Sequence, residues 1–353
     1  MNFDGGNCGK CGTTCKTGEH CIVGKCQKCP PGAQEICGNG RDDDCDGQAD
    51  EPSDCTAVPV LNNIYDYSIS SAGNIFAVYP SSNKIFGVCY DKTGKVRRNT
   101  FEIYKSSYYA GYPSVYTSST TGHTLVAWIS RPSSSWYYNR PYYRLYDANC
   151  KEVTSTIMFP ISTSWRTYDY DYSASIDANG NFAVLYRDSG YNPTIAFYTN
   201  KGTIRGSIKR VGAGTTYCRS RDWGLHVAMN SKGDGIVSCQ HGSSYIMYRR
   251  FKADTTFVEK DYVRVDGSVS KLYTSRVHAT GINDKGAFAF QWQARDQEDL
   301  YAAFYDATGK VVKLTRAGKS IYNSSSSFRY VHQQIPTMGD DFVLRDVNNS
   351  NNE

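Results

Sequence analysis

The stretch YSASIDANGNFAVLY, residues 172–186, decides the fold because related copies of it return along the chain at nearly constant spacing. In this stretch, apolar and polar residues alternate on either side of a turn centred on Gly180. Such alternation across a short glycine turn is typical of an antiparallel β-hairpin with one buried face, and the glycine supplies the positive φ angle that the turn needs. The turn glycines of the six copies are Gly73, Gly122, Gly180, Gly233, Gly286 and Gly339.

A second hairpin follows each of the first five glycines, as in VCYDKTGKV around Tyr90 and AAFYDATGKV around Tyr305. The turn glycines are 49, 58, 53, 53 and 53 residues apart. Two hairpins make a four-stranded sheet, and long regular repeats of such units predict a radial array of small sheets. We therefore predict an all-β fold with a six-bladed β-propeller in residues 56–353. Residues 56–64 would close the ring by adding an outer strand to the last sheet. An open stack of hairpins or a β-sandwich is the alternative.

Composition agrees with one large β domain and one small domain. Apolar residues make up 40% and charged residues 21% of the 353 residues, enough to bury a core and too few charges for bulk disorder. The 29 tyrosines favour strands, and no useful helical period is present. No stretch of about 18 apolar residues occurs, so no membrane span is expected.

Cysteine use indicates an oxidising compartment. Nine of the 13 cysteines lie in residues 1–55, a loop-rich segment with too few apolar side chains to form a core. The spacing Cys8-x-x-Cys11 and Cys26-x-x-Cys29 also suits zinc, but we favour disulfides and a secreted or cell-surface protein. The start MNFDGG has no secretory signal, so we expect that a leader precedes this numbering or that Met1 is engineered.

The most specific motif in residues 1–55 is CGNGRDDDCDGQADE, residues 37–51. Its alternating aspartates, followed by Gly47 and a further aspartate, match the first nine positions of a calcium-binding loop, in which alternate carboxylates point inward. Position twelve is Ser53 in place of the usual glutamate, so Glu51 or water must complete the shell. An all-oxygen ligand set favours calcium over softer metals. The predicted ligands are Asp42, Asp44, Asp46, Gln48, Asp50 and Glu51. The alternative is a solvated acidic loop.

This motif, with Cys29 before it and Cys55 after it, resembles the metal-binding motif of secreted bacterial proteins that are sometimes called MopE-like. The preceding run NCGKCGTTCKTGEHCIVGKC, residues 7–26, resembles the Cys-rich module that often accompanies it. The resemblance covers residues 8–55 only. It implies an extracellular location next to a larger domain, and the family name suggests copper, whereas the residues here indicate calcium.

Cysteine parity leaves one residue without a local partner. Cys29, Cys37, Cys45 and Cys55 can close two bridges around the acidic loop, which leaves five cysteines upstream. The odd cysteine must form its disulfide with a cysteine that precedes this sequence, with Cys89 or Cys150, or with a cysteine of another chain. Cys218 and Cys239 are expected to pair locally.

Blade geometry predicts that the glycine hairpins and the second hairpins share one end of the propeller, and that the remaining loops share the other. That second end carries aromatic and arginine side chains in the loop RPSSSWYYNRPY, residues 131–142, and in the connections between blades. Its predicted ligand-binding residues are Trp136, Tyr137, Tyr138, Arg166, Arg221, Trp223, Arg276 and Arg329. Aromatic rings suit sugars and guanidinium groups suit carboxylates. Packing between blades is the alternative use of the aromatic residues.

Three of the six histidines, His226, His278 and His332, occupy equivalent places before their turn glycines. On adjacent inner strands they could converge near the channel and bind a metal or an anion. The alternative is that they are ordinary polar residues of a wet channel.

The sequence lacks Gly-x-Ser-x-Gly, HExxH, phosphate-loop and dinucleotide-binding motifs, so we lean against an enzyme. Residues 1–55 carry 5 basic and 10 acidic side chains, which leaves 34 basic and 24 acidic side chains in residues 56–353. We predict a calcium-binding adhesion module for an extracellular glycan or protein, and no nucleic-acid partner, because the positive charges are dispersed. The alternatives are a self-associating subunit of a fibre or coat, and a polysaccharide hydrolase or lyase that uses the channel histidines.

Overall fold

The computed structural model describes residues 19–22, 25–28, 64–131, 140–159, 172–188, 192–212, 224–241, 245–265, 274–294, 299–319, 333–334, 337–338 and 341–342. Spatial contacts divide the chain into two compact units, one of Met1–Asn62 with Tyr90–Val96 and one of Asn63–Cys89 with Arg97–Glu353. The described part of the first unit includes the hairpin of β1 (Glu19–Ile22) and β2 (Lys25–Lys28).

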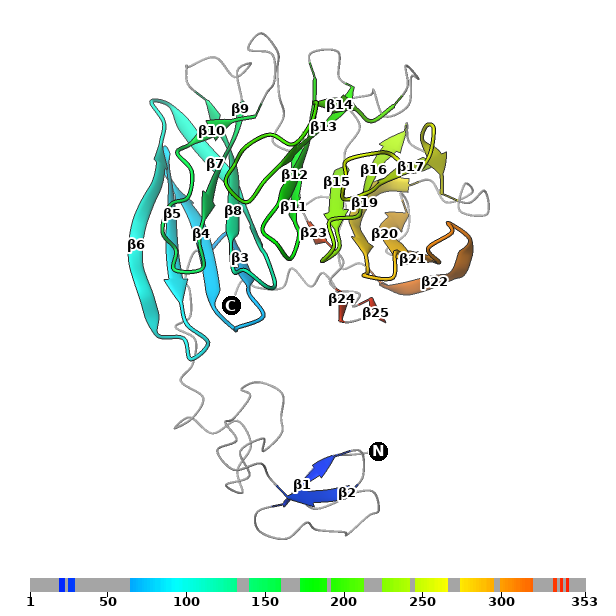
Figure 1. Cartoon of the computed structure of the whole chain (residues 1–353), viewed down its shortest axis with the longest axis horizontal. Coiled ribbons are helices and arrows are strands. Elements are labelled where there is room, and N and C mark those ends of the chain that lie inside the picture. The colour runs from blue at the N-terminus through cyan, green and yellow to red at the C-terminus, as the bar shows by residue number, and fades with distance from the viewer. Residues whose placement is uncertain are drawn as a thin grey trace. The chain divides into compact units, whose positions relative to one another are not determined.

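Five sheets follow one another along the chain (Figure 1). The first contains β3 (Asp66–Ile69), β4 (Ile75–Ser81), β5 (Lys84–Tyr90) and β6 (Val96–Lys105). The second contains β7 (Tyr109–Thr117), β8 (Thr124–Arg131), β9 (Arg140–Tyr146) and β10 (Ile157–Met158). The third contains β11 (Tyr172–Ile176), β12 (Phe182–Arg187), β13 (Pro193–Tyr198) and β14 (Lys209–Arg210).

The fourth sheet contains β15 (Leu225–Met229), β16 (Gly235–His241), β17 (Tyr245–Phe251) and β18 (Val263–Arg264). The fifth contains β19 (Thr274–Ile282), β20 (Phe288–Ala294), β21 (Asp299–Tyr305) and β22 (Val311–Lys319), and β23 (Gln333–Gln334) pairs with β19 in parallel. A final hairpin of β24 (Thr337–Met338) and β25 (Asp341–Phe342) flanks Gly339, the sixth predicted turn glycine.

The five sheets form a β-propeller, as predicted. In the first four sheets the first strand lies at one edge and the later strands follow in chain order, and in the fifth sheet β23 pairs on the outer side of the first strand, β19. The first strands of successive sheets, β3, β7, β11, β15 and β19, lie next to one another. Small four-stranded sheets whose first strands adjoin in this way are the blades of a propeller. After β22, the described residues contain β23, which belongs to the fifth sheet, and the separate β24–β25 hairpin.

The turn positions agree with the sequence. Gly73, Gly122, Gly180, Gly233 and Gly286 all have positive φ angles, between 67° and 90°. The second hairpin of each sheet also turns through a positive φ, at Gly94, Cys150, Gly202, Thr255 and Gly309. At Cys150 and Thr255 this left-handed conformation is adopted by residues with a Cβ, which costs about 1 kcal/mol relative to glycine.

The hydrophobic core lies between the sheets. Each large apolar cluster combines residues of two neighbouring sheets, as where Tyr143 of the second sheet packs against Phe182 and Tyr198 of the third. In the third sheet the second strand, β12, is therefore buried on both faces, and every one of its residues is buried. This corrects the expectation of half-buried hairpins: small residues such as Ala183 fill the face that the alternating pattern assigned to solvent. Burial raises the pKa of the deeply buried tyrosines Tyr116, Tyr146, Tyr172 and Tyr262.

Polar side chains of one inner strand bind the backbone of the next. The Asp66 carboxylate accepts a hydrogen bond from Val115 N at 2.8 Å. The hydroxyls of Ser173 and Ser175 accept hydrogen bonds from Val227 N at 3.1 Å and from Met229 N at 2.9 Å. Since these bonds satisfy inner-strand N–H groups, they fix the register of one sheet against the next.

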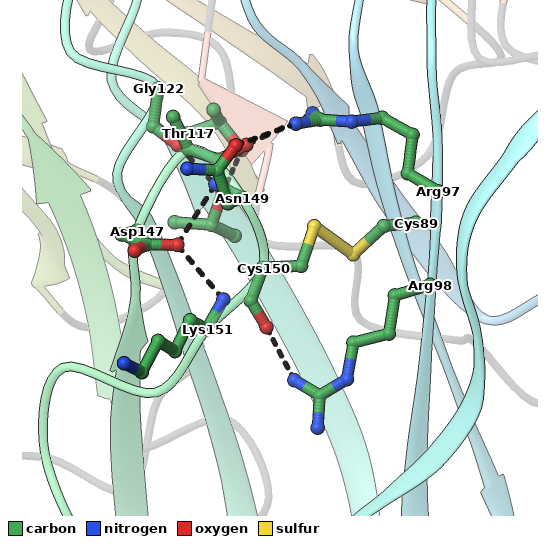
Figure 2. Close-up of a disulfide and its surroundings, with 11 residues drawn as sticks. Cys89, Arg97, Arg98, Thr117, Gly122, Asp147, Asn149, Cys150 and Lys151 are labelled. Carbon is green, nitrogen blue, oxygen red and sulfur yellow. Dashed lines mark hydrogen bonds between the residues drawn. A yellow bond between two sulfur atoms is a disulfide. The ribbon is translucent and has the colours of Figure 1, made fainter.

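A disulfide joins the first two sheets (Figure 2). Cys89 at the end of β5 bonds Cys150 in the turn after β9, 61 residues later, with 6.7 Å between the Cα atoms. This excludes both cysteines as partners of the odd cysteine in residues 1–55. Cys239 is also disulfide-bonded, and its predicted partner Cys218 lies outside the described residues.

Candidate functional site

The two ends of the propeller sheets differ in chemistry. We call the end that carries the glycine turns the turn end. The opposite end carries the β4–β5 and β8–β9 connections and the connections from each sheet to the next, and we call it the loop end. Hydrogen bonds link the glycine turns of neighbouring sheets: Ser118 Oγ donates to Ala178 O at 2.9 Å, Ala178 N to Ser231 O at 3.2 Å, and Asn230 Nδ2 to Asn283 O at 3.0 Å. These polar groups therefore stabilise the packing of one sheet against the next.

Basic side chains near the second hairpins also bind neighbouring sheets. Arg97 donates to Ala148 O and Asn149 Oδ1, both at 2.9 Å (Figure 2). Arg205 donates to Ala253 O at 2.7 Å, and Lys209 Nζ donates to Thr255 O at 2.6 Å. Backbone and amide oxygens of the neighbouring sheets therefore engage these cations of the turn end.

At the loop end, a short connection between the first two sheets presents tyrosines. Ser106 N donates to Asn83 O at 2.9 Å, and Ser106 Oγ donates to Arg131 O at 2.8 Å. These bonds hold the connection against the β4–β5 turn and β8, and Tyr108, which follows, is 57% exposed. The exposed ring is thus attached to a fixed backbone, which lowers the entropy cost of binding.

A β-bulge in β7 positions a second tyrosine. Gly111 pairs with Ile129 and Ser114 pairs with Ala127, so Tyr112 and Pro113 together face Trp128. Tyr112 has a φ of 52°, unusual for a bulky residue, and its carbonyl accepts a hydrogen bond from the Tyr172 hydroxyl at 2.8 Å. Bulges redirect side chains and are common next to functional sites.

The bulge brings an aromatic cluster together with a cation. The Tyr112 ring lies 6.3 Å from the rings of both Tyr65 and Tyr109. Tyr109 pairs with Arg131 across β7 and β8, and the Arg131 guanidinium lies 5.1 Å from the Tyr109 ring centre. A Cβ at Gly111 would collide with the Tyr109 ring, so any larger residue there would displace this ring. We call Tyr65, Tyr108, Tyr109, Tyr112 and Arg131 the tyrosine platform.

Most of the sequence-predicted ligand residues lie outside the described residues. They are Trp136, Tyr137, Tyr138, Arg166, Arg221, Trp223 and Arg329. Trp136, Tyr137 and Tyr138 belong to residues 132–139, which connect Arg131, the last residue of β8, to Arg140, the first of β9. Arg276 was expected in a connection between blades and instead lies within β19, because β20 extends to Ala294 and pairs with the early residues of β19.

The predicted channel histidines are partly placed. His226 lies on β15 and is buried, 7% exposed, and His278 lies on the adjacent inner strand β19. Val277 pairs with Trp292 and Ala279 with Gln291, so His278 is the extra residue of a bulge. His332 lies outside the described residues.

The predicted calcium ligands Asp42, Asp44, Asp46, Gln48, Asp50 and Glu51 all lie outside the described residues. Within the part of the chain that is described, no group of three His, Cys, Asp or Glu side chains could hold a metal ion. No helix there is long and apolar enough to cross a membrane.

Sequence reasoning predicted the loop end as the binding surface but missed the tyrosine platform. The signal in the sequence was KSSYYAGYPSVY, residues 105–116, a strand-like stretch in which four tyrosines and one proline flank Gly111. Proline inside a strand pattern points to an edge or a bulge. Which side chains meet there depends on pairing between distant strands.

Comparisons with known proteins return similarities of fold alone. No protein-family model matches the sequence, and no curated protein sequence matches it. Among solved structures, the fucose-specific lectin from Aleuria aurantia is 13% identical, with 74% of this chain and 79% of the lectin covered and a TM-score of 0.47. The hydrazine synthase of Kuenenia stuttgartiensis is 13% identical, with 73% and 66% covered and a TM-score of 0.45. TolB from Acinetobacter baumannii is 12% identical, with 73% and 55% covered and a TM-score of 0.41. Similarities this low carry no argument about a ligand.

Proposed function

We propose that this chain is a non-catalytic extracellular binding module that holds a glycan or a protein on the loop end of its propeller. The observation that carries the proposal is the aromatic surface at the loop end. The exposed Tyr108 ring lies there on a backbone that hydrogen bonds hold in place, next in the chain to Tyr109, whose ring contacts the Arg131 guanidinium. Rigid scaffolds commonly carry binding residues on one set of loops.

The chemistry of the platform suits glycans and protein surfaces. Tyrosine offers a large, rigid ring with a polar hydroxyl, and arginine offers a planar set of donors. Residues 132–139 continue directly from Arg131, so we propose that Trp136, Tyr137 and Tyr138 extend the same surface. The Cys89–Cys150 disulfide in the propeller supports an oxidising, extracellular location.

We also propose that a sixth blade closes the ring. Tyr67 and Ile69 of the first sheet are 52% and 53% exposed, and Val312 and Leu314 of the fifth are 68% and 39% exposed. Apolar faces on the first and last described sheets are what a further sheet would cover. Ile69→Lys should then lower the free energy of unfolding by several kcal/mol in urea titrations, about the cost of burying a charge, whereas Val258→Lys at the turn end should change little. Equal, small effects would contradict a covered face.

The acidic loop of residues 37–51 is proposed to bind one calcium ion through its aspartates. Calorimetric titration of the whole oxidised protein with Ca²⁺ should show one site per chain. The Asp44→Asn and Asp46→Asn variants should lose at least about tenfold in affinity, because each removes a carboxylate charge from the ligand set. Asp54→Asn, outside the loop, is the control and should bind like the parent. An unchanged titration for all three variants would refute the site.

Binding by the loop end is tested with a glycan array and a pull-down from extracellular protein mixtures. The parent protein should retain a partner, Tyr109→Ala should retain less, and the turn-end control Lys201→Gln should match the parent. Assembly of the pure protein with no partner would favour the fibre or coat subunit. Turnover of a polysaccharide that His278→Ala abolishes would favour the hydrolase or lyase.

A further inference from the structure

Exposed apolar side chains gather on one rim of the propeller. Among the described residues of the second, third and fourth sheets, the exposed large apolar side chains, each 37–46% exposed, are Val153, Ile204, Ile208 and Val258. All four follow the turn of a second hairpin within six residues, so they lie on the outer part of the sheets toward the turn end. We call these four residues the rim strip. Single exposed apolar residues are ordinary on a protein surface, whereas a set confined to one region marks an interaction site.

Contacts between neighbouring sheets make the rim strip continuous. The second-hairpin turn of the third sheet touches the second sheet, because a Cβ at Gly202 would collide with the Thr154 methyl group. On the other side, Lys209 Nζ donates to Thr255 O of the fourth sheet at 2.6 Å. Residues 202–209 therefore bridge the second and fourth sheets, and the rim strip runs across all three.

The middle of the rim strip is basic. Residues 199–209, TNKGTIRGSIK, contain three cations and no acid. Arg205 and Lys209 donate to carbonyl oxygens, which carry no net charge, so the positive charge of both side chains is not neutralised. Lys201 and, in the second sheet, Lys151 are exposed, and their ammonium groups have no partner among the residues that the structure describes.

The acids beside the rim strip leave this charge in excess. Glu152 pairs with Arg144 at 2.9 Å, and Glu259 pairs with Arg250 at 2.5 Å. The acids of residues 147–158 and 252–259 that have no such ion pair accept hydrogen bonds from N–H groups of their own turns; they are Asp147 and Asp254. Two acids thus stand against four cations, and a surface of this sign attracts anions.

We propose that the rim strip rests on an anionic lipid surface, with its four apolar side chains among the headgroups and Lys151 and Lys201 at the lipid phosphates. Proteins that bind a membrane surface combine apolar side chains that enter the interface with basic side chains that attract anionic lipids. Lysine suits this contact, because its ammonium group is a point charge on a flexible stem. Protein interfaces are instead built around aromatic and arginine anchors, whereas the rim strip consists of β-branched side chains.

This contact goes beyond the proposed function and is compatible with it. The loop end lies at the opposite end of the same sheets, so a protein that rests on its rim strip leaves the loop end open to a glycan or a protein.

Vesicle flotation of the full-length, oxidised protein tests the contact. The protein should float with vesicles of phosphatidylglycerol and phosphatidylcholine in equal parts. It should bind pure phosphatidylcholine vesicles at least about tenfold more weakly, and about 0.5 M NaCl should release it from the mixed vesicles.

Two double variants separate the apolar and the basic contributions. Ile204→Ser with Ile208→Ser should weaken vesicle binding about tenfold, because less apolar area enters the interface. Lys151→Gln with Lys201→Gln should weaken it about thirtyfold, roughly fivefold for each lysine. The charge control Lys105→Gln at the loop end, and Ile204→Leu with Ile208→Leu, which keeps the apolar area, should bind like the parent. Urea midpoints should show that every variant is folded.

The outcomes decide between a lipid surface and other partners. No flotation, equal binding to both kinds of vesicle, or equal binding by the parent and both double variants would overturn the inference. Retention on polyglutamate beads without flotation, lost in the same variants, would assign the rim strip to an acidic protein and overturn the lipid contact. The proposed function is tested separately by the glycan array and the pull-down with Tyr109→Ala, so either can fail while the other stands.

Discussion

Removing the Cys89–Cys150 disulfide should lower stability by a predictable amount. The bond spans 61 residues and links β5 to the turn after β9, and both cysteines are buried, 0% and 5% exposed. In the chain-entropy account, closing a loop of this length removes about 4 kcal/mol of conformational freedom from the unfolded state. The Cys89→Ala, Cys150→Ala double variant should therefore lose about 4 kcal/mol of unfolding free energy.

Urea titration followed by tryptophan fluorescence measures the effect. With a slope of about 3 kcal/mol per molar urea, the midpoint should fall by roughly 1.3 M. Substitution is preferred to a reductant, because a reductant would act on all 13 cysteines. Cys150 has a φ of 62°, so Cys89→Ala with Cys150→Gly should be about 0.5–1 kcal/mol more stable than the double alanine variant. A loss below about 1 kcal/mol would show that the bond does not constrain the unfolded chain, and the reasoning would fail.

Two further predictions test the packing between blades. Ser173→Ala and Ser175→Ala should each lower the free energy of unfolding by about 1–3 kcal/mol in the same titration, because a buried N–H of β15 loses its acceptor. The control Ser207→Ala, at an exposed position, should change the free energy of unfolding little. Equal effects of all three substitutions would refute the inter-blade role. High pH should unfold the protein, because burial raises the pKa of the deeply buried tyrosines in the folded state. Their contribution to the free energy of unfolding is complete below pH 10 and is lost as the pH rises above 10. The loss should be about 1.4 kcal/mol per tyrosine by pH 11. Tyrosinate absorbance and circular dichroism should then change together above pH 10, whereas smooth ionisation without unfolding would contradict this.

The candidate site shows where sequence reasoning reaches its limit. The spacing of the repeats placed the Trp136 loop between the second and third strands of the second sheet. In the structure, β8 ends before this loop and β9 begins after it. It did not reveal that Tyr109 faces Arg131, because this contact depends on the β7–β8 register and on a bulge at Tyr112. A one-residue bulge leaves almost no trace in an alternating pattern.

The sequence by itself determined the strands, the turns and their number per repeat, because a positive φ at Gly180 and its equivalents and the alternation around them are local properties. Only the tertiary structure decided that β12 is buried on both faces, that Cys89 pairs with Cys150, and that a tyrosine platform forms at the loop end. These features arise between sheets, where residues some 50 positions apart meet, and local chemistry does not specify which of them come into contact.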